Sequence, residues 1–190
     1  MANHEAFCTA EEALARLKEG NKKFLAGEQA GALTQELRGD LVANGQHPYA
    51  CVVACSDSRV LPETIFCAGA GELFVVRTAG NTITASEMAS VAYAGNHLQV
   101  PLVVVMGHTH CGAVGAALSD HKDEDVEHIV GGIRNVIGQE KEPRKCEMLN
   151  AQAWAKKIAD STIFASHIKE GKKKVVAALY DTESGKVEFY

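Results

Sequence analysis

The chain has 190 residues, of which 46% are hydrophobic, 23% charged and 6% aromatic. This composition is typical of folded globular proteins and excludes a disordered or fibrous chain. A chain of this length buries enough surface to fold without disulfides or a structural metal, so a metal site would indicate chemistry. Its 24 acidic residues exceed its 19 basic ones, for a formal net charge of -5, which argues against a nucleic acid as partner.

The sequence contains no segment typical of a membrane span or a secretion signal. Its longest apolar run, Val100–Met106, is far shorter than the roughly 20 residues that cross a bilayer. The stretch MANHEAFCTAEE has no basic region followed by an apolar one. We therefore expect a cytoplasmic protein with no membrane partner. Its six cysteines are expected to be thiols, metal ligands or catalytic groups rather than disulfides.

Two helices are predicted in the first 46 residues. Thr9-Ala10-Glu11-Glu12 has the spacing of a capping box, and apolar residues then recur at helical intervals until Gly27. A shorter helix is expected from Thr34 to about Gly45, where glycine is a common stop signal. We expect residues 1–46 to form a helical arm and residues 47–190 an α/β core, which together make a single domain over 1–190.

Short apolar runs in the rest of the chain are typical of parallel strands buried on both faces. They are Ala50–Cys55, Leu73–Val76, Leu102–Met106 and Val175–Leu179, with an edge strand expected over Lys186–Tyr190. Helices are expected at 84–98, 112–118, 129–137 and from Pro143 through Phe164, and a solvated acidic loop at 120–127. The alternation predicts an α/β fold with a central, mainly parallel sheet of four to five strands covered by helices.

The residues best suited to chemistry follow the first and third predicted strands. Cys55-Ser56-Asp57-Ser58-Arg59 follows the first strand, and His108-Thr109-His110-Cys111-Gly112 follows the third. If these strands are neighbours, Cys55, His108 and Cys111 converge at the carboxyl end of the sheet, where open parallel sheets bind ligands. Two thiolates and one imidazole are a known set of three protein ligands for catalytic zinc. Alternation along an extended backbone would place Asp57 and Arg59 on the same side as Cys55.

Together these two motifs resemble the signature of the beta-class carbonic anhydrases. Further similarity lies in Gly20-Asn21 with Phe24, in Phe74-Val75-Val76-Arg77 leading into Ala79-Gly80-Asn81, and in Tyr180-Asp181 with Ser184-Gly185. Residues 10–118 fit the family pattern closely, whereas residues 120–174 fit it loosely. The resemblance implies self-association as a homodimer or a dimer of dimers.

The resemblance also implies a zinc enzyme that reversibly hydrates carbon dioxide to bicarbonate and a proton, by attack of a zinc-bound hydroxide. It assigns zinc to Cys55, His108 and Cys111, and a catalytic, orienting role to the pair Asp57 and Arg59. In some members of the family the residue at Asp57 occupies the fourth zinc position instead. Because two thiolates cancel the formal charge of Zn²⁺, the bound water should ionise less readily than in a site with three histidines, and we expect activity to favour alkaline pH.

Two alternatives share this zinc site. One is a hydrolase of carbonyl sulfide or carbon disulfide, which no residue among the ligands distinguishes from a carbonic anhydrase. The other is a zinc-binding module without turnover, in which Asp57 closes the site permanently.

Several residues next to these motifs are expected near the site without binding the metal. Gly80 and Asn81 should form a tight turn in which Gly80 allows close backbone approach, and Gly112 directly follows a ligand. His110 forms a His-x-His pair with His108 but is expected at the rim of the site. The remaining cysteines are interpreted as ordinary thiols; they are Cys8, Cys51, Cys67 and Cys146.

Overall fold

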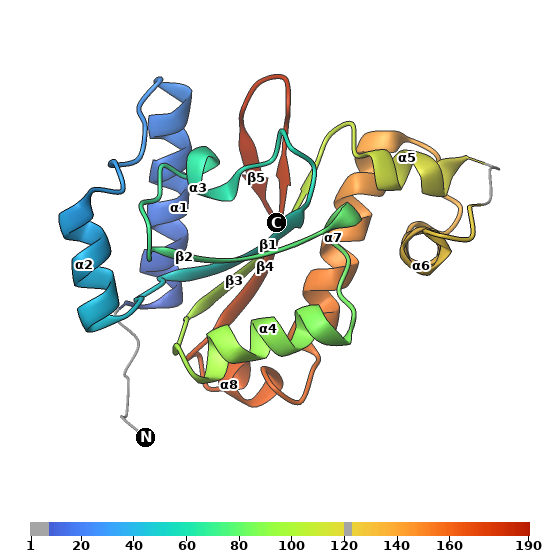
Figure 1. Cartoon of the computed structure of the whole chain (residues 1–190). Helices are drawn as coiled ribbons and strands as arrows, with labels where there is room; N and C mark the ends of the chain where they lie inside the picture. Colours follow the sequence, from blue (N-terminus) through green and yellow to red (C-terminus); the bar gives the residue numbers. More distant parts are fainter. Residues whose placement is uncertain (1–7, 120–122) are drawn as a thin grey trace.

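A five-stranded sheet forms the centre of the computed structural model, which describes residues 8–119 and 123–190 (Figure 1). Residues 120–122, at the start of the expected acidic loop, lie outside the described residues, as do residues 1–7. The sheet order is β2-β1-β3-β4-β5. Its strands are β1 (Ala50–Cys55), β2 (Leu73–Thr78), β3 (Leu102–His108), β4 (Lys174–Tyr180) and β5 (Val187–Phe189). The first four pair in parallel and β5 pairs antiparallel to β4, which confirms the predicted α/β class.

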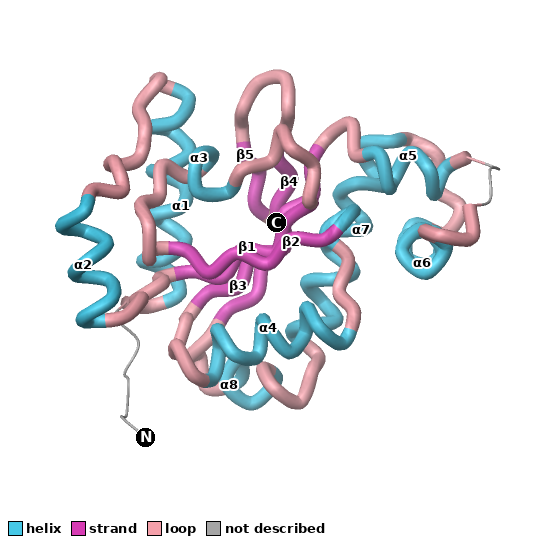
Figure 2. Tube along the Cα trace, in the orientation of Figure 1, coloured by secondary structure: helices cyan, strands magenta, loops and turns pink. Residues whose placement is uncertain are grey.

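Helices pack on both faces of the sheet, as Figure 2 shows. They are α1 (Ala10–Leu25), α2 (Gln35–Asn44), α3 (Pro62–Ile65), α4 (Ala85–Asn96), α5 (Gly112–Leu118), α6 (Glu127–Ile137), α7 (Pro143–Ala159) and α8 (Ala165–Lys169), with a 3₁₀ turn, η1, at Ala79–Asn81. The N-terminal helix is present as expected. The boundary between an arm of residues 1–46 and a core of residues 47–190 stays a prediction.

Helix α1 begins at the predicted capping box and packs closely against the core. The Thr9 side chain accepts a hydrogen bond from the backbone N–H of Glu12, and the Glu12 carboxylate accepts one from the backbone N–H of Thr9. Further along the helix, a methyl group on Gly20 would collide with the carbonyl oxygen of Phe66, so glycine allows α1 to approach the end of α3. Asn21 then donates a hydrogen bond to the carbonyl of Gly185 at 2.9 Å, which connects α1 to the turn between β4 and β5.

Alternate residues of the strands enter two separate apolar clusters, because successive side chains of a strand point to opposite faces. Val52 and Val104 belong to the cluster on the face of α1 and α3. Val53 and Val105 belong to the cluster on the opposite face, with residues of α4 and α7. This arrangement explains why the strands read as continuous apolar runs, as expected for a sheet covered on both sides.

The end of the long C-terminal helix differs from the prediction. Helix α7 ends at Ala159, and Phe164 precedes the separate short helix α8. A turn intervenes, in which the backbone N–H of Phe164 donates to the carbonyl of Ser161. Phe164 is fully buried beside Gly95 of α4, so the spacing that suggested a continuous helix reflects two elements packed in one apolar cluster.

The expected acidic loop was to extend to residue 127, but Glu127 is the first residue of α6. Within the described residues, no helix has the length and apolar character needed to cross a membrane.

Candidate metal centre

Three buried side chains converge at the carboxyl ends of β1 and β3. Sγ of Cys55, one ring nitrogen of His108 and Sγ of Cys111 all lie within 4.8 Å of one another. Their exposed fractions are 6%, 0% and 4%. Within residues 8–119 and 123–190, this is the group of Cys, His and carboxylate side chains close enough to share one metal ion.

The parallel pairing of β1 with β3 produces this convergence. Ala54 lies opposite Met106 in the register, so the strands carry Cys55 and His108 to adjacent positions at the same edge. The chain then turns through Thr109 and His110 to Cys111, which precedes α5. The third ligand atom therefore comes from the loop rather than from a strand.

His108 is oriented as a metal ligand would be. Its Nδ1 lies 2.9 Å from the carbonyl oxygen of Thr109. Because a carbonyl can only accept, Nδ1 carries the ring proton and Nε2 presents its lone pair. That buried Nε2 has no hydrogen-bond partner among the described residues, although an unpaired buried polar atom is costly. A metal ion bound between the two sulfurs would satisfy it, so the residues fit the metal that the sequence predicts.

The pKa values of the two cysteines shift in opposite directions. The adjacent Cys111 thiol, together with His108 and the backbone N–H groups of Asp57 and Gly80, lowers the pKa of Cys55 against the opposing effect of burial. The Cys55 sulfur and burial both raise the pKa of Cys111. Burial is the largest single effect and lowers the pKa of His108, but Cys55, the Thr109 carbonyl and Asp57 together raise it more, so the net shift is upward. Cys55 is therefore the first thiolate of the pair.

Asp57 and Arg59 form a two-point ion pair beside the centre. Arg59 Nη2 donates to Asp57 Oδ2 at 2.7 Å, and Arg59 Nε donates to Asp57 Oδ1 at 2.9 Å. These hydrogen bonds lower the pKa of the Asp57 carboxyl well below its usual range, so it is ionised at neutral pH. The expected alternation along an extended backbone does not explain the position of these side chains. Strand β1 ends at Cys55, and Ser58 and Arg59 already lie in a turn.

Arg77 on β2 fixes the turn that carries Asp57. Its Nε donates to the carbonyl of Cys55 at 3.1 Å, and its Nη2 donates to the carbonyl of Asp57 at 2.7 Å. One guanidinium thus ties the first ligand and the acidic residue to the neighbouring strand. Arg77 belongs to the stretch Phe74–Arg77 that resembles the family pattern, but no role at the site was expected for it.

Gly80 and Asn81 lie next to the centre in the expected tight turn. Gly80 has φ +64°, and its N–H donates to the Cys55 sulfur at 3.3 Å. A Cβ there would lie 2.8 Å from Cδ1 of Ile133 and 3.0 Å from Cβ of Ala113. Asn81 is 1% exposed, with φ +47°, and its Nδ2 has no hydrogen-bond partner among the described residues. Both residues therefore occupy conformations that L side chains rarely adopt.

Two further residues of the second motif differ in their surroundings. His110 lies outside the metal-ligand group, and its exposed ring pairs with Glu183 at 3.4 Å. Gly112 begins α5, and a Cβ there would have no heavy atom within 4 Å. Close packing therefore does not require glycine at position 112, in contrast to position 80.

The remaining cysteines take no part in the metal-ligand group. Cys51 is fully buried in the apolar cluster with Val53, and burial raises its pKa to about 12. Cys146 is buried in the same cluster as Cys55 and Cys111, but its thiol donates to the carbonyl of Glu140. All six cysteines are free in this structure.

Helix α7 supplies two polar residues that the sequence analysis missed. Glu147 is 3% exposed, and its Oε1 accepts a hydrogen bond from the backbone N–H of Cys111 at 3.0 Å. Burial raises the pKa of this carboxyl. Asn150 is fully buried, and its Nδ2 donates to the carbonyl of Gly80 at 2.8 Å. Their signal in the sequence is weak, because an isolated polar residue on a helix usually faces solvent.

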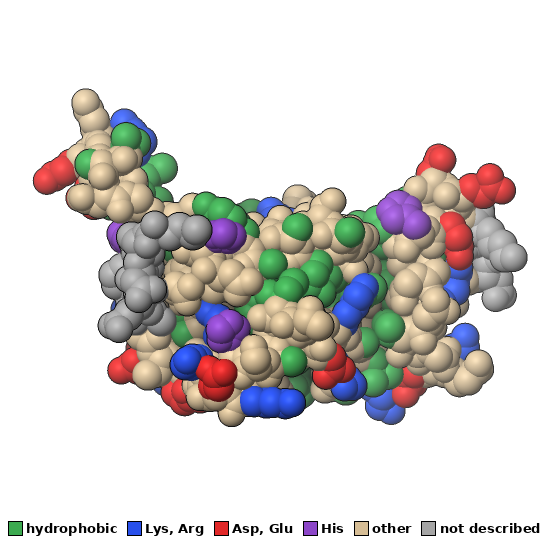
Figure 3. Space-filling model, turned by 90° about the horizontal axis from the view of Figure 1, so that it is seen from below, with side chains coloured by type: hydrophobic (Ala, Val, Ile, Leu, Met, Phe, Trp, Pro, Cys, Tyr) green, Lys and Arg blue, Asp and Glu red, His purple; other side chains and the backbone are tan. Residues whose placement is uncertain are grey.

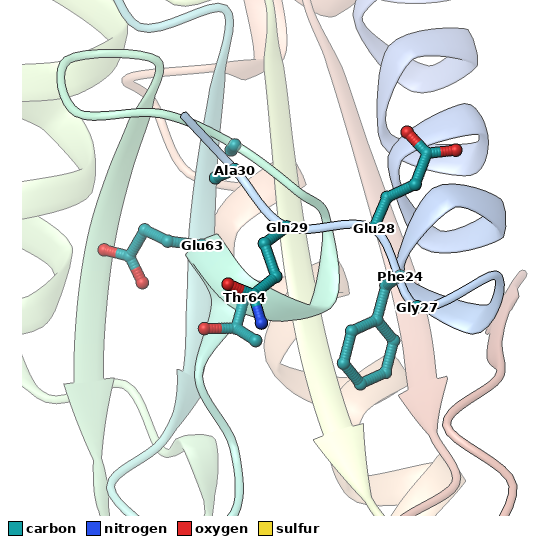
Figure 4. Close-up of a pocket in the computed structure, with 8 residues that line it drawn as sticks. Phe24, Gly27, Glu28, Gln29, Ala30, Glu63 and Thr64 are labelled. Atoms are coloured by element: carbon teal, nitrogen blue, oxygen red, sulfur yellow. The ribbon is translucent and has the colours of Figure 1, made fainter. Parts of the chain in front are cut away.

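A separate pocket of about 490 Å³ lies between the end of α1 and α3 (Figure 4). Its lining includes Phe24, Glu28, Glu63 and Thr64, and none of the three metal-ligand residues. The pocket therefore does not form part of the metal centre.

The chain is similar to several known proteins. Residues 50–187 match the carbonic anhydrase family. Carbonic anhydrase 2 of Mycobacterium tuberculosis is 46% identical over 122 residues, which cover 64% of this chain and 58% of that protein. The carbonic anhydrase of Mycolicibacterium smegmatis is 34% identical over 185 residues, which cover 90% of this chain and 89% of that protein.

Solved structures show the same fold. One of the tetrameric beta-carbonic anhydrases from the filamentous ascomycete Sordaria macrospora superimposes with a TM-score of 0.75 at 26% identity. The superposition covers 82% of this chain and 86% of that chain.

Proposed function

Since this chain belongs to the beta-carbonic anhydrase family, we propose that it catalyses the reversible hydration of carbon dioxide to bicarbonate and a proton. The observation that carries the proposal is the convergence of Cys55, His108 and Cys111, with the unpartnered Nε2 of His108 among them. The chain spans 58% of the length of Mycobacterium tuberculosis carbonic anhydrase 2, so the proposed activity rests on the converging side chains.

Zinc is the metal that suits this donor set best. Two thiolates and one imidazole are an established combination for a catalytic zinc site, whose fourth position is kept for water or substrate. When bound, zinc supplies Lewis acidity that lowers the pKa of water and so provides a nucleophile near neutral pH.

Asp57 is suited to orient that nucleophile. As an ionised carboxylate it can only accept hydrogen bonds, so it would accept one from the O–H of the nucleophile and direct a lone pair toward carbon dioxide. Arg59 restrains Asp57 through two hydrogen bonds of 2.7 and 2.9 Å. Asp57 is therefore a catalytic residue in this proposal, and Arg59 is a positioning residue.

The same ion pair bears on the alternative of a zinc module without turnover. That alternative needs the Asp57 carboxylate on the metal, where metal binding would compete with the two hydrogen bonds from the Arg59 side chain. Asp57 also lies outside the group of atoms close enough to share an ion. The geometry therefore supports an accessible fourth position.

Stopped-flow hydration of carbon dioxide, measured from acid to alkaline pH on protein of known zinc content, tests the proposal. We expect one zinc per chain and a rate that rises toward alkaline pH, because two thiolates reduce the acidity of the bound water. Carbonyl sulfide and carbon disulfide are assayed in parallel. Faster turnover of either would assign the site to the alternative hydrolase, and no turnover of any of the three would contradict an enzymatic role.

We also propose that the chain self-associates as a homodimer or a dimer of dimers. Helix α2 has no buried residue within the chain, and Val42 on it is 87% exposed. Apolar side chains also gather in the middle of the face on which α4 and α8 lie (Figure 3). Such exposed apolar surface often marks a protein interface, and the similar Sordaria macrospora protein is described as tetrameric. The expected cytoplasmic location stays a prediction.

Light scattering during size exclusion tests this association. We expect a mass of two or four times 20.3 kDa and a shift toward the monomer in Val42→Glu, since a charge would be buried at the contact. A wild-type mass of 20.3 kDa would contradict the proposal.

A further inference from the structure

The peptide bond between His110 and Cys111 is held on both sides by charged side chains. Its carbonyl oxygen accepts a hydrogen bond from Arg59 Nη2 at 3.0 Å. Its N–H, which belongs to Cys111, donates to Glu147 Oε1, also at 3.0 Å. A cationic donor and a carboxyl acceptor thus hold opposite ends of one peptide group. We call Arg59, Glu147 and this peptide the peptide clamp.

The clamped peptide follows a strained residue. His110 has φ +59°, a left-handed conformation that is unfavourable for a residue with a side chain and persists where surrounding contacts hold it. Rotation of this peptide would change ψ of His110 and φ of Cys111, and so would move Cys111, whose sulfur is one of the three converging atoms. The position of that sulfur therefore depends on the hydrogen bonds at both ends of the peptide.

The fold brings Glu147 to this place through a close contact between α7 and β3. Gly107, directly before His108, lies against α7, and a Cβ on it would be 3.0 Å from the backbone oxygen of Glu147 and 3.3 Å from Cβ of Ala151. The small residue lets the helix approach the end of the strand. The side chain of Glu147 then reaches the Cys111 N–H although the two residues are 36 positions apart.

The two sides of the clamp differ in exposure. The Arg59 side chain is 53% exposed, so water can replace its donor on the carbonyl oxygen. Glu147 is 3% exposed, so its loss would leave the Cys111 N–H buried without an acceptor. The buried side therefore contributes more to the orientation of the peptide.

From this geometry we propose that Glu147 is a positioning residue that orients Cys111 for metal binding through the His110–Cys111 peptide. The inference rests on the proposed metal role of Cys111. Partners of this kind, which touch a ligand and not the metal, commonly change metal affinity by about 10- to 100-fold. Glu147 acts in this role as a hydrogen-bond acceptor, with no change in its protonation.

The test compares Glu147→Ala and Glu147→Gln with a control that removes other buried hydrogen bonds. Lys173→Met serves as the control, because Lys173 is 7% exposed and donates to the carbonyls of Gly95 and Val100. We expect zinc transfer to a chromogenic chelator to accelerate at least about tenfold in Glu147→Ala. Glu147→Gln keeps an acceptor oxygen and should lie between Glu147→Ala and the wild type, while Lys173→Met should match the wild type.

Two further measurements separate orientation from general stability. In cobalt-loaded protein the sulfur-to-cobalt absorption band should shift in Glu147→Ala and stay unchanged in Lys173→Met. In the metal-free chain, hydrogen exchange of the Cys111 amide should be at least about tenfold faster in Glu147→Ala than in the wild type. The proposal would be overturned if folded Glu147→Ala transferred zinc at the wild-type rate with an unchanged cobalt band. It would also be overturned if Lys173→Met showed effects as large as those of Glu147→Ala.

The amide measurement also separates this inference from the proposed function. A wild-type chain that binds no stoichiometric metal would contradict the zinc enzyme. The exchange rate of the Cys111 amide in the wild type and in Glu147→Ala would still decide whether Glu147 holds the peptide. Stoichiometric zinc together with unchanged amide exchange in Glu147→Ala would contradict the clamp and leave the zinc enzyme intact.

Discussion

Alanine should destabilise the chain at Gly80 and have little effect at Gly112, although both glycines lie beside the candidate metal centre. Gly80 has φ +64°, where an alanine costs about 1 kcal/mol or more relative to glycine. The added Cβ would lie 2.8 Å from Cδ1 of Ile133, a side chain that is itself fully buried, and overpacking of this kind costs roughly 1–3 kcal/mol. We therefore expect Gly80→Ala to lower the free energy of unfolding by about 2–4 kcal/mol.

Gly112→Ala is the matched control. No heavy atom lies within 4 Å of a Cβ at this position, and the residue is the first of α5. Alanine is up to about 1 kcal/mol more favourable than glycine inside a helix and less so at its first position, so the change should be within about 1 kcal/mol and of either sign. Urea unfolding of both metal-free variants, followed by circular dichroism, gives the comparison. A Gly80→Ala midpoint equal to that of Gly112→Ala would refute the reasoning from steric contact.

Most of the sheet and the convergence of Cys55, His108 and Cys111 could be predicted from the sequence because their signals are local. Continuous apolar runs indicate strands buried on both faces, and the carboxyl ends of parallel strands lie at one edge. Once β1 and β3 are neighbours, Cys55 and His108 must be close. The sheet order β2-β1-β3-β4-β5 makes β1 and β3 neighbours. The pattern of apolar runs in the sequence did not establish this order.

Apolar spacing predicts only part of the buried face of α7. Of the apolar residues at helical spacing there, Ile158 is fully buried, whereas Leu149 and Trp154 are partly exposed. The buried residues include Glu147, Asn150 and Ala151, which are polar or small. A helix that packs on Gly107 needs small residues for close approach, and polar ones where it meets backbone groups of the metal centre. Hydrophobic periodicity measures neither requirement.

Two remaining predictions concern ion pairs outside the metal-ligand group. Arg59→Ala should retain one zinc per chain but lower carbon dioxide turnover about tenfold or more, because Asp57 loses its restraint. Atomic absorption measures the zinc content and stopped flow the turnover. Loss of zinc would instead assign Arg59 a structural role. Asp181→Asn should lower stability at pH 7 by about 1 kcal/mol. Hydrogen bonds from the backbone and side chain of Ser184, with Arg144, lower the pKa of Asp181 from 3.8 to about 2. A lowered pKa stabilises the folded chain above pH 3.8, and that contribution disappears as the pH falls through about 2. The difference in the free energy of unfolding between wild type and Asp181→Asn, measured in urea, should therefore shrink between about pH 5 and pH 2. A difference that stays constant over this range would show that the charge of Asp181 does not stabilise the turn.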